Sequence, residues 1–302
     1  MSCDPSSAGR PALRCWDGAG TRISTCSGRE LRGRLAPTRA AGASSDTVRE
    51  IPYRTAGGRA LLLHVSAPPE PSDSPAPAAV FYHGGGWERG TWRQFQPQAA
   101  RLNALGMVTV LVEYRTEGPV TATEDAVAAM NAVFERAGDL GCDVGRVVAI
   151  GGSAGGQLAL ATAVLDLPDI DDRHRPAALV LLNPVTDTTG DFPAGFGRRH
   201  FDNDDDARRY SPMHHLDGGA PPLLIMHGTA DTAVHHENSV AFVDRLLSAG
   251  GRAELVLYAG QRHGFFNPAE AGHGIGDDTD SHFEITTAEM IGFIRRTVIE
   301  GR

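Results

Sequence analysis

Short apolar runs recur along most of the chain, separated by segments whose apolar residues have helical spacing. Six runs predict buried strands, at 79–82, 107–114, 146–150, 177–182, 223–226 and 254–258. Their nearly continuous apolarity is typical of parallel strands that are covered on both faces. Helical spacing predicts helices over 95–104, 123–137 and 155–165, and a capping box at Ser281 and Glu284 predicts a last helix. This alternation predicts an α/β fold: a doubly wound, mostly parallel sheet with helices on both faces.

Two strand-like segments precede this region. Residues 48–55 and 59–66 are joined through Gly57 and Gly58, and a glycine pair between strands favours a tight hairpin. The Pro-rich stretch 67–77 is expected to be a surface connection, because proline cannot donate to a strand ladder. Since no long polar interruption follows, we expect residues 46–302 to form one domain.

Residues 1–45 differ in composition from the rest. They hold three of the four cysteines, many small residues and few large apolar ones, so they bury too little surface to offset their ordering entropy. We expect a disordered N-terminal tail, and a cap over the functional site is the alternative. No signal-peptide or membrane-spanning run is visible, which predicts a cytoplasmic protein with reduced thiols and no membrane partner.

Charge and composition exclude several kinds of chemistry. All the basic residues are arginine, and a chain without lysine has no Schiff-base, Walker A or Ser-Lys chemistry. The formal net charge is −9 and no basic cluster is present, so we expect no nucleic-acid partner. The acidic run 202–206 is expected to be a solvated face, and no histidine pair has metal-binding spacing. We expect no metal and no cofactor.

The strongest chemical signal is Ser153 within the glycine-rich stretch 151–156, where a predicted strand meets a predicted helix. A serine on such a tight turn, flanked by small residues, is typical of a nucleophile raised above a parallel sheet. The glycines of His-Gly-Gly-Gly-Trp at 83–87 could turn N–H groups toward a developing oxyanion. Asp231 follows the predicted strand 223–226, and His263 follows the predicted strand 254–258. The order Ser, Asp, His along the chain is that of α/β-hydrolases.

With these residues in view, the chain resembles the α/β-hydrolase superfamily. The similarity covers roughly residues 48–299 and is to esterases with an HGGG motif, such as the hormone-sensitive-lipase-like and acetyl(xylan)-esterase-like groups. The resemblance implies a triad of Ser153, Asp231 and His263. It also implies oxyanion donors at the N–H groups of Gly85, Gly86 and Ala154.

We therefore expect a serine esterase that cleaves short-chain, acetyl-type esters through an acyl-enzyme. An amidase, such as a formamidase, would use the same triad. A non-catalytic ligand-binding module on a hydrolase fold is a further alternative, against which the presence of His263 counts. The expected partner is a small-molecule ester; an acetylated sugar is one candidate, and the oligomeric state is not indicated.

One long insertion, 183–217, interrupts the predicted sheet, and substrate-defining segments belong in such places. Its aromatic residues are candidates for lining the acyl or alcohol pocket: Phe192, Phe196, Phe201 and Tyr210. The insertion is modest in length, so we expect a short acyl pocket. Trp87 and Trp92 beside the glycine loop could stack on a sugar, although such residues more often pack the loop.

Overall fold

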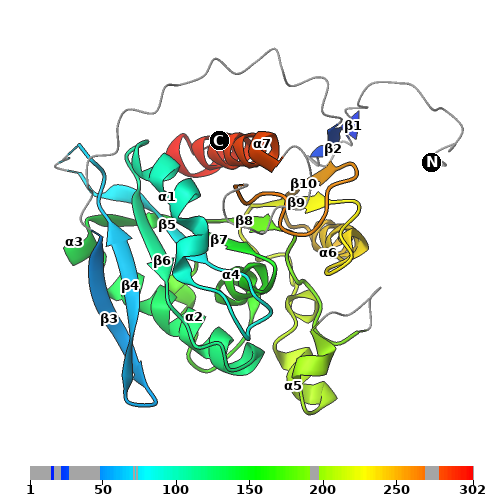
Figure 1. Ribbon diagram of the computed structural model, residues 1–302, viewed down its shortest axis with the longest axis horizontal. Coiled ribbons are helices and arrows are strands. Elements are labelled where there is room, and N and C mark those ends of the chain that lie inside the picture. Colours follow the sequence, from blue (N-terminus) through cyan, green and yellow to red (C-terminus); the bar gives the residue numbers. More distant parts are fainter. Residues whose placement is uncertain are drawn as a thin grey trace, which may run out of the picture.

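The computed structural model describes residues 15–16, 22–26, 48–70, 72, 74–190, 197–268 and 279–301 (Figure 1). These residues contribute to one sheet in the order β1-β2-β10-β9-β8-β7-β5-β6-β4-β3. The strands are β1 (Cys15–Trp16), β2 (Arg22–Cys26), β3 (Arg49–Ala56), β4 (Arg59–Ser66), β5 (Ala76–Tyr82), β6 (Val108–Val112), β7 (Cys142–Gly152), β8 (Ala178–Leu182), β9 (Leu223–Gly228) and β10 (Ala253–Tyr258). The strands from β5 to β10 pair in parallel, which confirms the predicted sheet.

The predicted hairpin is the pair β3 and β4, which closes the antiparallel end of the sheet. Gly57 and Gly58 both have positive φ angles, 57° and 77°, as a two-residue turn between twisted strands requires. Pro52 lies on the outermost strand, beside a shift of register between Pro52 and Arg54. Both features are tolerated there because an edge strand has no partner on its outer side.

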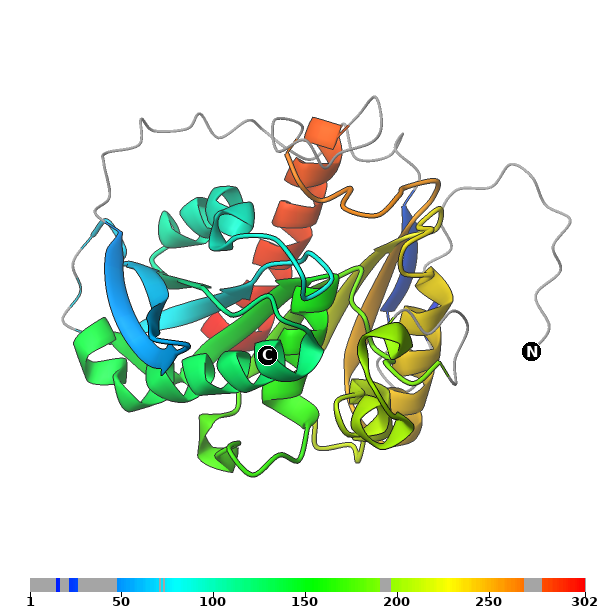
Figure 2. The same ribbon diagram turned by 60° about the horizontal axis from the view of Figure 1, so that its bottom comes forward.

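Helices cover both faces of the sheet (Figure 2). They are α1 (Gln96–Asn103), α2 (Pro119–Glu135), α3 (Ala137–Leu140), α4 (Ala154–Val164), α5 (Asp204–Arg209), α6 (His236–Ser248) and α7 (Thr279–Ile294). Helices α1 and α7 pack in one core, and α2, α4 and α6 pack in the other. Successive residues of β7 alternate between these cores, with Val147 and Ala149 in one and Val148 and Ile150 in the other. The doubly wound α/β architecture is thereby confirmed.

Two predicted helix starts are wrong. Helix α2 begins at Pro119 instead of residue 123, because proline suits the first helical position and Gly118 supplies a φ of 108° before it. Helix α7 begins at Thr279, so Ser281 lies inside the helix and is not its cap. Glu284, the expected partner of Ser281, instead accepts a hydrogen bond from Arg101 on α1 at 2.6 Å.

Part of the segment 1–45 belongs to the sheet. Strand β2 pairs in parallel with β10, and β1 pairs antiparallel with β2. The expectation of a tail without structure is therefore not met at these two strands, and the rest of the segment lies outside the described residues. The physical reason is that β10 has an edge with unpaired backbone groups, and Ile23 and Thr25 favour the extended conformation needed to pair with it.

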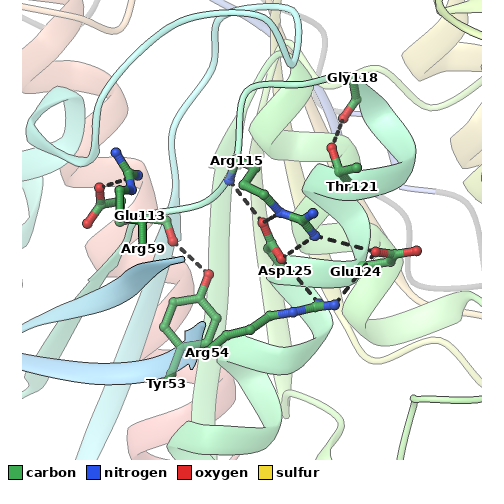
Figure 3. Close-up of polar contacts among 9 residues, drawn as sticks. All are labelled: Tyr53, Arg54, Arg59, Glu113, Arg115, Gly118, Thr121, Glu124 and Asp125. Atoms are coloured by element: carbon green, nitrogen blue, oxygen red, sulfur yellow. Dashed lines mark hydrogen bonds and ion pairs between the residues drawn. The ribbon is translucent and has the colours of Figure 1, made fainter. Parts of the chain in front are cut away.

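An ion-pair network around the buried Asp125 joins β3, α2 and the loop after β6 (Figure 3). The fully buried Asp125 accepts hydrogen bonds from Nε and Nη2 of Arg115 at 2.8 and 2.9 Å, and Arg54 lies 3.1 Å away. A buried carboxylate requires such partners, since its charge has lost its hydration. Three residues after Arg115, the amide of Gly118 donates to the carbonyl of Trp87, so the network also fixes the glycine loop.

The contact between α4 and the end of β5 gives a test of the fold. A Cβ atom on Gly155 would lie 2.1 Å from the carbonyl oxygen of Tyr82, so the helix would have to move away from the strand. We expect Gly155→Ala to lower the free energy of unfolding by about 1–3 kcal/mol, the usual cost of overpacking. Urea denaturation measures this change.

Gly138→Ala is the matched control, because nothing lies within 4 Å of the added Cβ on helix α3. Alanine is the better helix former there, so stability should stay the same or rise slightly. Equal stability of the two variants would contradict the close approach of α4 to β5.

Candidate active site

Ser153 occupies a strained turn between β7 and α4. Its φ and ψ angles are 56° and −121°, a conformation that non-glycine residues rarely adopt. The surrounding packing holds it there: the amide of Ser153 donates to the carbonyl of Leu182, and Ser153 accepts at its own carbonyl from Val185. Such local strain is typical of functional sites.

The structure brings Ser153, His263 and Asp231 together. Nδ1 of His263 lies 2.7 Å from Oδ2 of Asp231, and Nε2 lies 2.9 Å from Oγ of Ser153. Because a carboxylate only accepts hydrogen bonds, Nδ1 carries the proton. Nε2 is then the acceptor for the serine hydroxyl, so the three side chains form one chain of hydrogen bonds.

Asp231 lies in a buried site rich in donors. Its Oδ1 accepts hydrogen bonds from the amides of Ala233 and Val234, both at 2.9 Å. Burial alone would raise the pKa of Asp231, but the hydrogen bonds from His227 and His263, with that of the Val234 amide, outweigh it and hold the pKa well below its usual value. Asp231 therefore remains ionised at neutral pH.

His227 is a neighbour of Asp231 that the sequence pattern did not single out. It is fully buried, and its Nε2 lies 2.8 Å from the carbonyl of Val234 and 3.2 Å from Oδ2 of Asp231. Two acceptors at one nitrogen place the proton on Nε2, so Nδ1 accepts from the hydroxyl of Ser239. The sequence signal that could have indicated this contact is the position of His227 at the end of β9, four residues before Asp231.

The glycine loop after β5 is braced on several sides. The hydroxyl of Tyr114 donates to the carbonyl of His83 at 2.6 Å, and its ring stacks on the imidazole. Burial lowers the pKa of His83 to about 4, so this histidine is neutral and supports the loop. The amide of Gly84 donates to Oε1 of Gln94, and Gly84, Gly85 and Gly86 all line the cavity.

A cavity of about 560 Å³ lies above these groups. Its lining includes Ser153, His263, Gly85 and Gly86, with Phe266 as its large apolar side chain. Ala154 is buried at the N-terminus of α4, directly after Ser153. The triad and oxyanion residues proposed from the sequence therefore lie in or beside one site.

The predicted aromatic lining of the cavity is wrong for the two aromatic residues that the structure describes. Phe201 and Tyr210 pack with Ala161 and Leu165 in a separate apolar cluster, because the insertion folds back on the end of α4. Phe192 and Phe196 lie outside the described residues. The insertion contributes Arg199 and His200 to the cavity instead.

Trp87 and Trp92 both pack the loop. Trp87 is fully buried and donates to Oε1 of Gln157 at 3.0 Å, so it offers no face to a sugar. Trp92 stacks on His64 with 3.8 Å between ring centroids.

The acidic run 202–206 includes the first turn of α5, where Asn203 caps the helix. The acidic side chains there stabilise the N-terminus of the helix through its dipole.

In the part of the chain that the structure describes, no three His, Cys, Asp or Glu side chains converge as they would around a metal ion. Nor does any helix among those residues have the length and apolarity needed to cross a membrane.

Comparison with known proteins identifies the family. Residues 79–267 match the family described as alpha/beta hydrolase fold, and this is more than half of the chain. The chain therefore belongs to the α/β-hydrolase fold family.

Three of the similar proteins are ester hydrolases by name. A carboxylic ester hydrolase of Mycobacterium tuberculosis is 30% identical over 272 residues, covering 80% of this chain and 68% of that protein. Lipase 2 of a Moraxella species is 26% identical, and the match spans 67% of this chain but only 57% of the lipase. Esterase 2 of Thermogutta terrifontis, solved with butyrate bound, has a TM-score of 0.71 and 30% identity over 82% of this chain and 93% of its own.

The low pKa of Asp231 has a consequence for stability. A carboxyl whose pKa is lower in the folded than in the unfolded state, where it is about 3.9, stabilises the fold above that pH and loses this contribution as pH falls. We expect the free energy of unfolding of the wild type, minus that of Asp231→Asn, to decrease between pH 5 and pH 3. Urea denaturation across this range measures the difference. A difference that does not change with pH would contradict the environment described for Asp231.

Proposed function

We propose that this protein is a serine esterase that hydrolyses short-chain carboxylic esters. The observation that carries the proposal is the hydrogen-bond chain from Ser153 through His263 to Asp231, at the cavity. The family and the names of the relatives support ester hydrolysis as the reaction.

In this mechanism, Oγ of Ser153 attacks the ester carbonyl carbon while Nε2 of His263 takes the hydroxyl proton. Asp231 keeps the imidazole in the required tautomer and stabilises the imidazolium that forms. His263 then gives its proton to the leaving alcohol as the acyl-enzyme forms. A water molecule, deprotonated by the same histidine, releases the acid and regenerates Ser153.

The negative charge that develops on the carbonyl oxygen needs donors that are already in place. We assign this role to the amides of Gly85, Gly86 and Ala154. The ordered loop supports the assignment, because Gly85 has a φ of 124° and a Cβ there would lie 2.0 Å from the carbonyl oxygen of Arg89. Only glycine fits this position, and the carbonyl of Gly85 accepts hydrogen bonds from the amides of Glu88 and Arg89, which hold the turn.

A short acyl group is the finer part of the proposal. Thermogutta terrifontis esterase 2 has been solved with propionate and with butyrate bound. In the described part of the present chain, Phe266 is the large apolar side chain at the cavity, and the aromatic residues Phe201 and Tyr210 pack elsewhere. This lining suits acyl groups of a few carbons.

A series of 4-nitrophenyl esters from acetyl to octanoyl, with 4-nitroacetanilide as the amide, tests the proposal. We expect kcat/KM to be highest between acetyl and butyryl and the amide to be cleaved far more slowly. Ser153→Ala should reduce kcat by about four orders of magnitude or more while the protein stays folded, because the nucleophile is lost. An acetylated sugar added to the series tests that candidate alcohol.

Ser248→Ala is the matched control, since that serine is exposed on α6 and donates only to the carbonyl of Asp244. It should keep wild-type activity. Near-full activity of Ser153→Ala would refute the triad, a peak at octanoyl would refute the short acyl pocket, and faster cleavage of the amide would favour an amidase.

A further inference from the structure

We propose that the cavity selects esters that carry a carboxylate group elsewhere in the molecule, held by Arg89, Arg93 and Arg199. The inference rests on the proposed esterase function and adds the chemical class of its substrate. All three arginines line the cavity that contains Ser153 and His263.

The charge of the cavity wall is opposite to that of the protein. The chain has a formal net charge of −9, with 37 acidic and 28 basic residues. The lining nevertheless contains three arginines and one acid, Glu88. Oε1 of Glu88 lies 3.0 Å from Nδ1 of His200, and burial lowers the pKa of that histidine, so His200 adds no positive charge at neutral pH. Even when only Arg89 and Arg93 are counted against Glu88, the described lining of the cavity carries a net positive charge.

Several arginines elsewhere on the surface have acidic partners. Examples are the pairs Arg59 with Glu113, Arg101 with Glu284, Arg173 with Asp171, and Arg198 with Asp204. Among the described residues, in contrast, no carboxylate lies within 4.0 Å of the guanidinium of Arg89 or Arg93. Other described arginines, such as Arg245 and Arg252, also have no ion pair, but Arg89 and Arg93 differ from them in lining the cavity that contains Ser153. A ligand in this cavity can supply the negative charge that the two arginines lack.

Both of these arginines belong to the loop that carries the glycine amides. The amide of Arg89 donates to the carbonyl of Gly85. Arg93 lies in the 3₁₀ turn Trp92–Phe95, with its guanidinium 4.3 Å from the centroid of the Trp92 ring, and the next residue, Gln94, holds the amide of Gly84. These contacts fix the backbone of Arg89 and the guanidinium of Arg93 relative to the proposed oxyanion donors.

Arg199 reaches the cavity from the insertion, where Nε donates to Nε2 of His200 at 3.2 Å. The guanidinium group binds carboxylates through two parallel hydrogen bonds, which gives orientation as well as attraction. A cleft with one sign of charge also concentrates ligands of the opposite sign and speeds their association. An ester with a carboxylate on its acyl or its alcohol side fits this arrangement.

Two pairs of substrates test the proposal and separate these two sides. 4-Acetoxybenzoate and its methyl ester differ in charge on the alcohol side, and monomethyl succinate and methyl valerate differ on the acyl side. The readout is the ratio of kcat/KM for the anionic ester to that for its neutral partner. We expect a ratio of at least about tenfold in favour of the anion for one pair, decreasing as ionic strength rises.

Arg89→Gln and Arg93→Gln should each lower that ratio about two- to fivefold, as expected for partly exposed ion pairs, and the triple variant with Arg199→Gln should lower it at least about tenfold. Arg252→Gln is the matched control. Arg252 is an exposed arginine directly before β10, at the edge of the sheet opposite to His263, so its loss should leave the ratio unchanged.

A ratio near one for both pairs, unaffected by the arginine variants, would overturn the proposal and leave the esterase function in place. If no ester is cleaved at all, the proposed esterase function is refuted. Calorimetric measurement of 4-acetoxybenzoate binding to Ser153→Ala then tests the anion site by itself. Binding of 4-acetoxybenzoate that is lost in the triple arginine variant would support the anion site, and absence of binding would overturn it.

Discussion

The site depends on one steric constraint, the close approach of backbone to backbone where β5 and β7 end. Gly155 at the start of α4 lies against the carbonyl oxygens of Tyr82 and His83, and a Cβ on Gly84 would lie 3.0 Å from the carbonyl oxygen of Gly152. Because no side chains separate these segments, the glycine loop comes directly beside Ser153. The strained turn at Ser153 is the local cost of this arrangement, and the surrounding sheet supplies the packing that maintains it.

The two buried carboxylates Asp125 and Asp231 differ in the charge of the groups that contact them. The charge of Asp125 is balanced by ion pairs with Arg115 and Arg54, and these ion pairs join α2 to the sheet. Asp231 accepts hydrogen bonds from two amides, His263 and His227, of which only the histidines can gain a charge. The negative charge of Asp231 is therefore available to an imidazolium at His263.

Much of the fold and the site follows from local sequence signals. The apolar runs predict the parallel strands, and the spacing of Ser153, Asp231 and His263 after three of them predicts their convergence, since the carboxyl ends of parallel strands share one edge of a sheet. Features that depend on distant partners were not predictable. The pairing of β2 with β10, the packing of Phe201 away from the cavity and the position of Arg199 within it all depend on how long connections fold back, which periodicity does not encode.

We propose that His263 activates Ser153 as a nucleophile, and covalent labelling by a fluorophosphonate is the sharpest test of that role. Intact-mass analysis and peptide mapping should find one label per chain, on Ser153. His263→Ala should slow the labelling by about two orders of magnitude or more, because the base that removes the hydroxyl proton is gone. Labelling of another residue, or equal rates in the wild type and His263→Ala, would contradict the account.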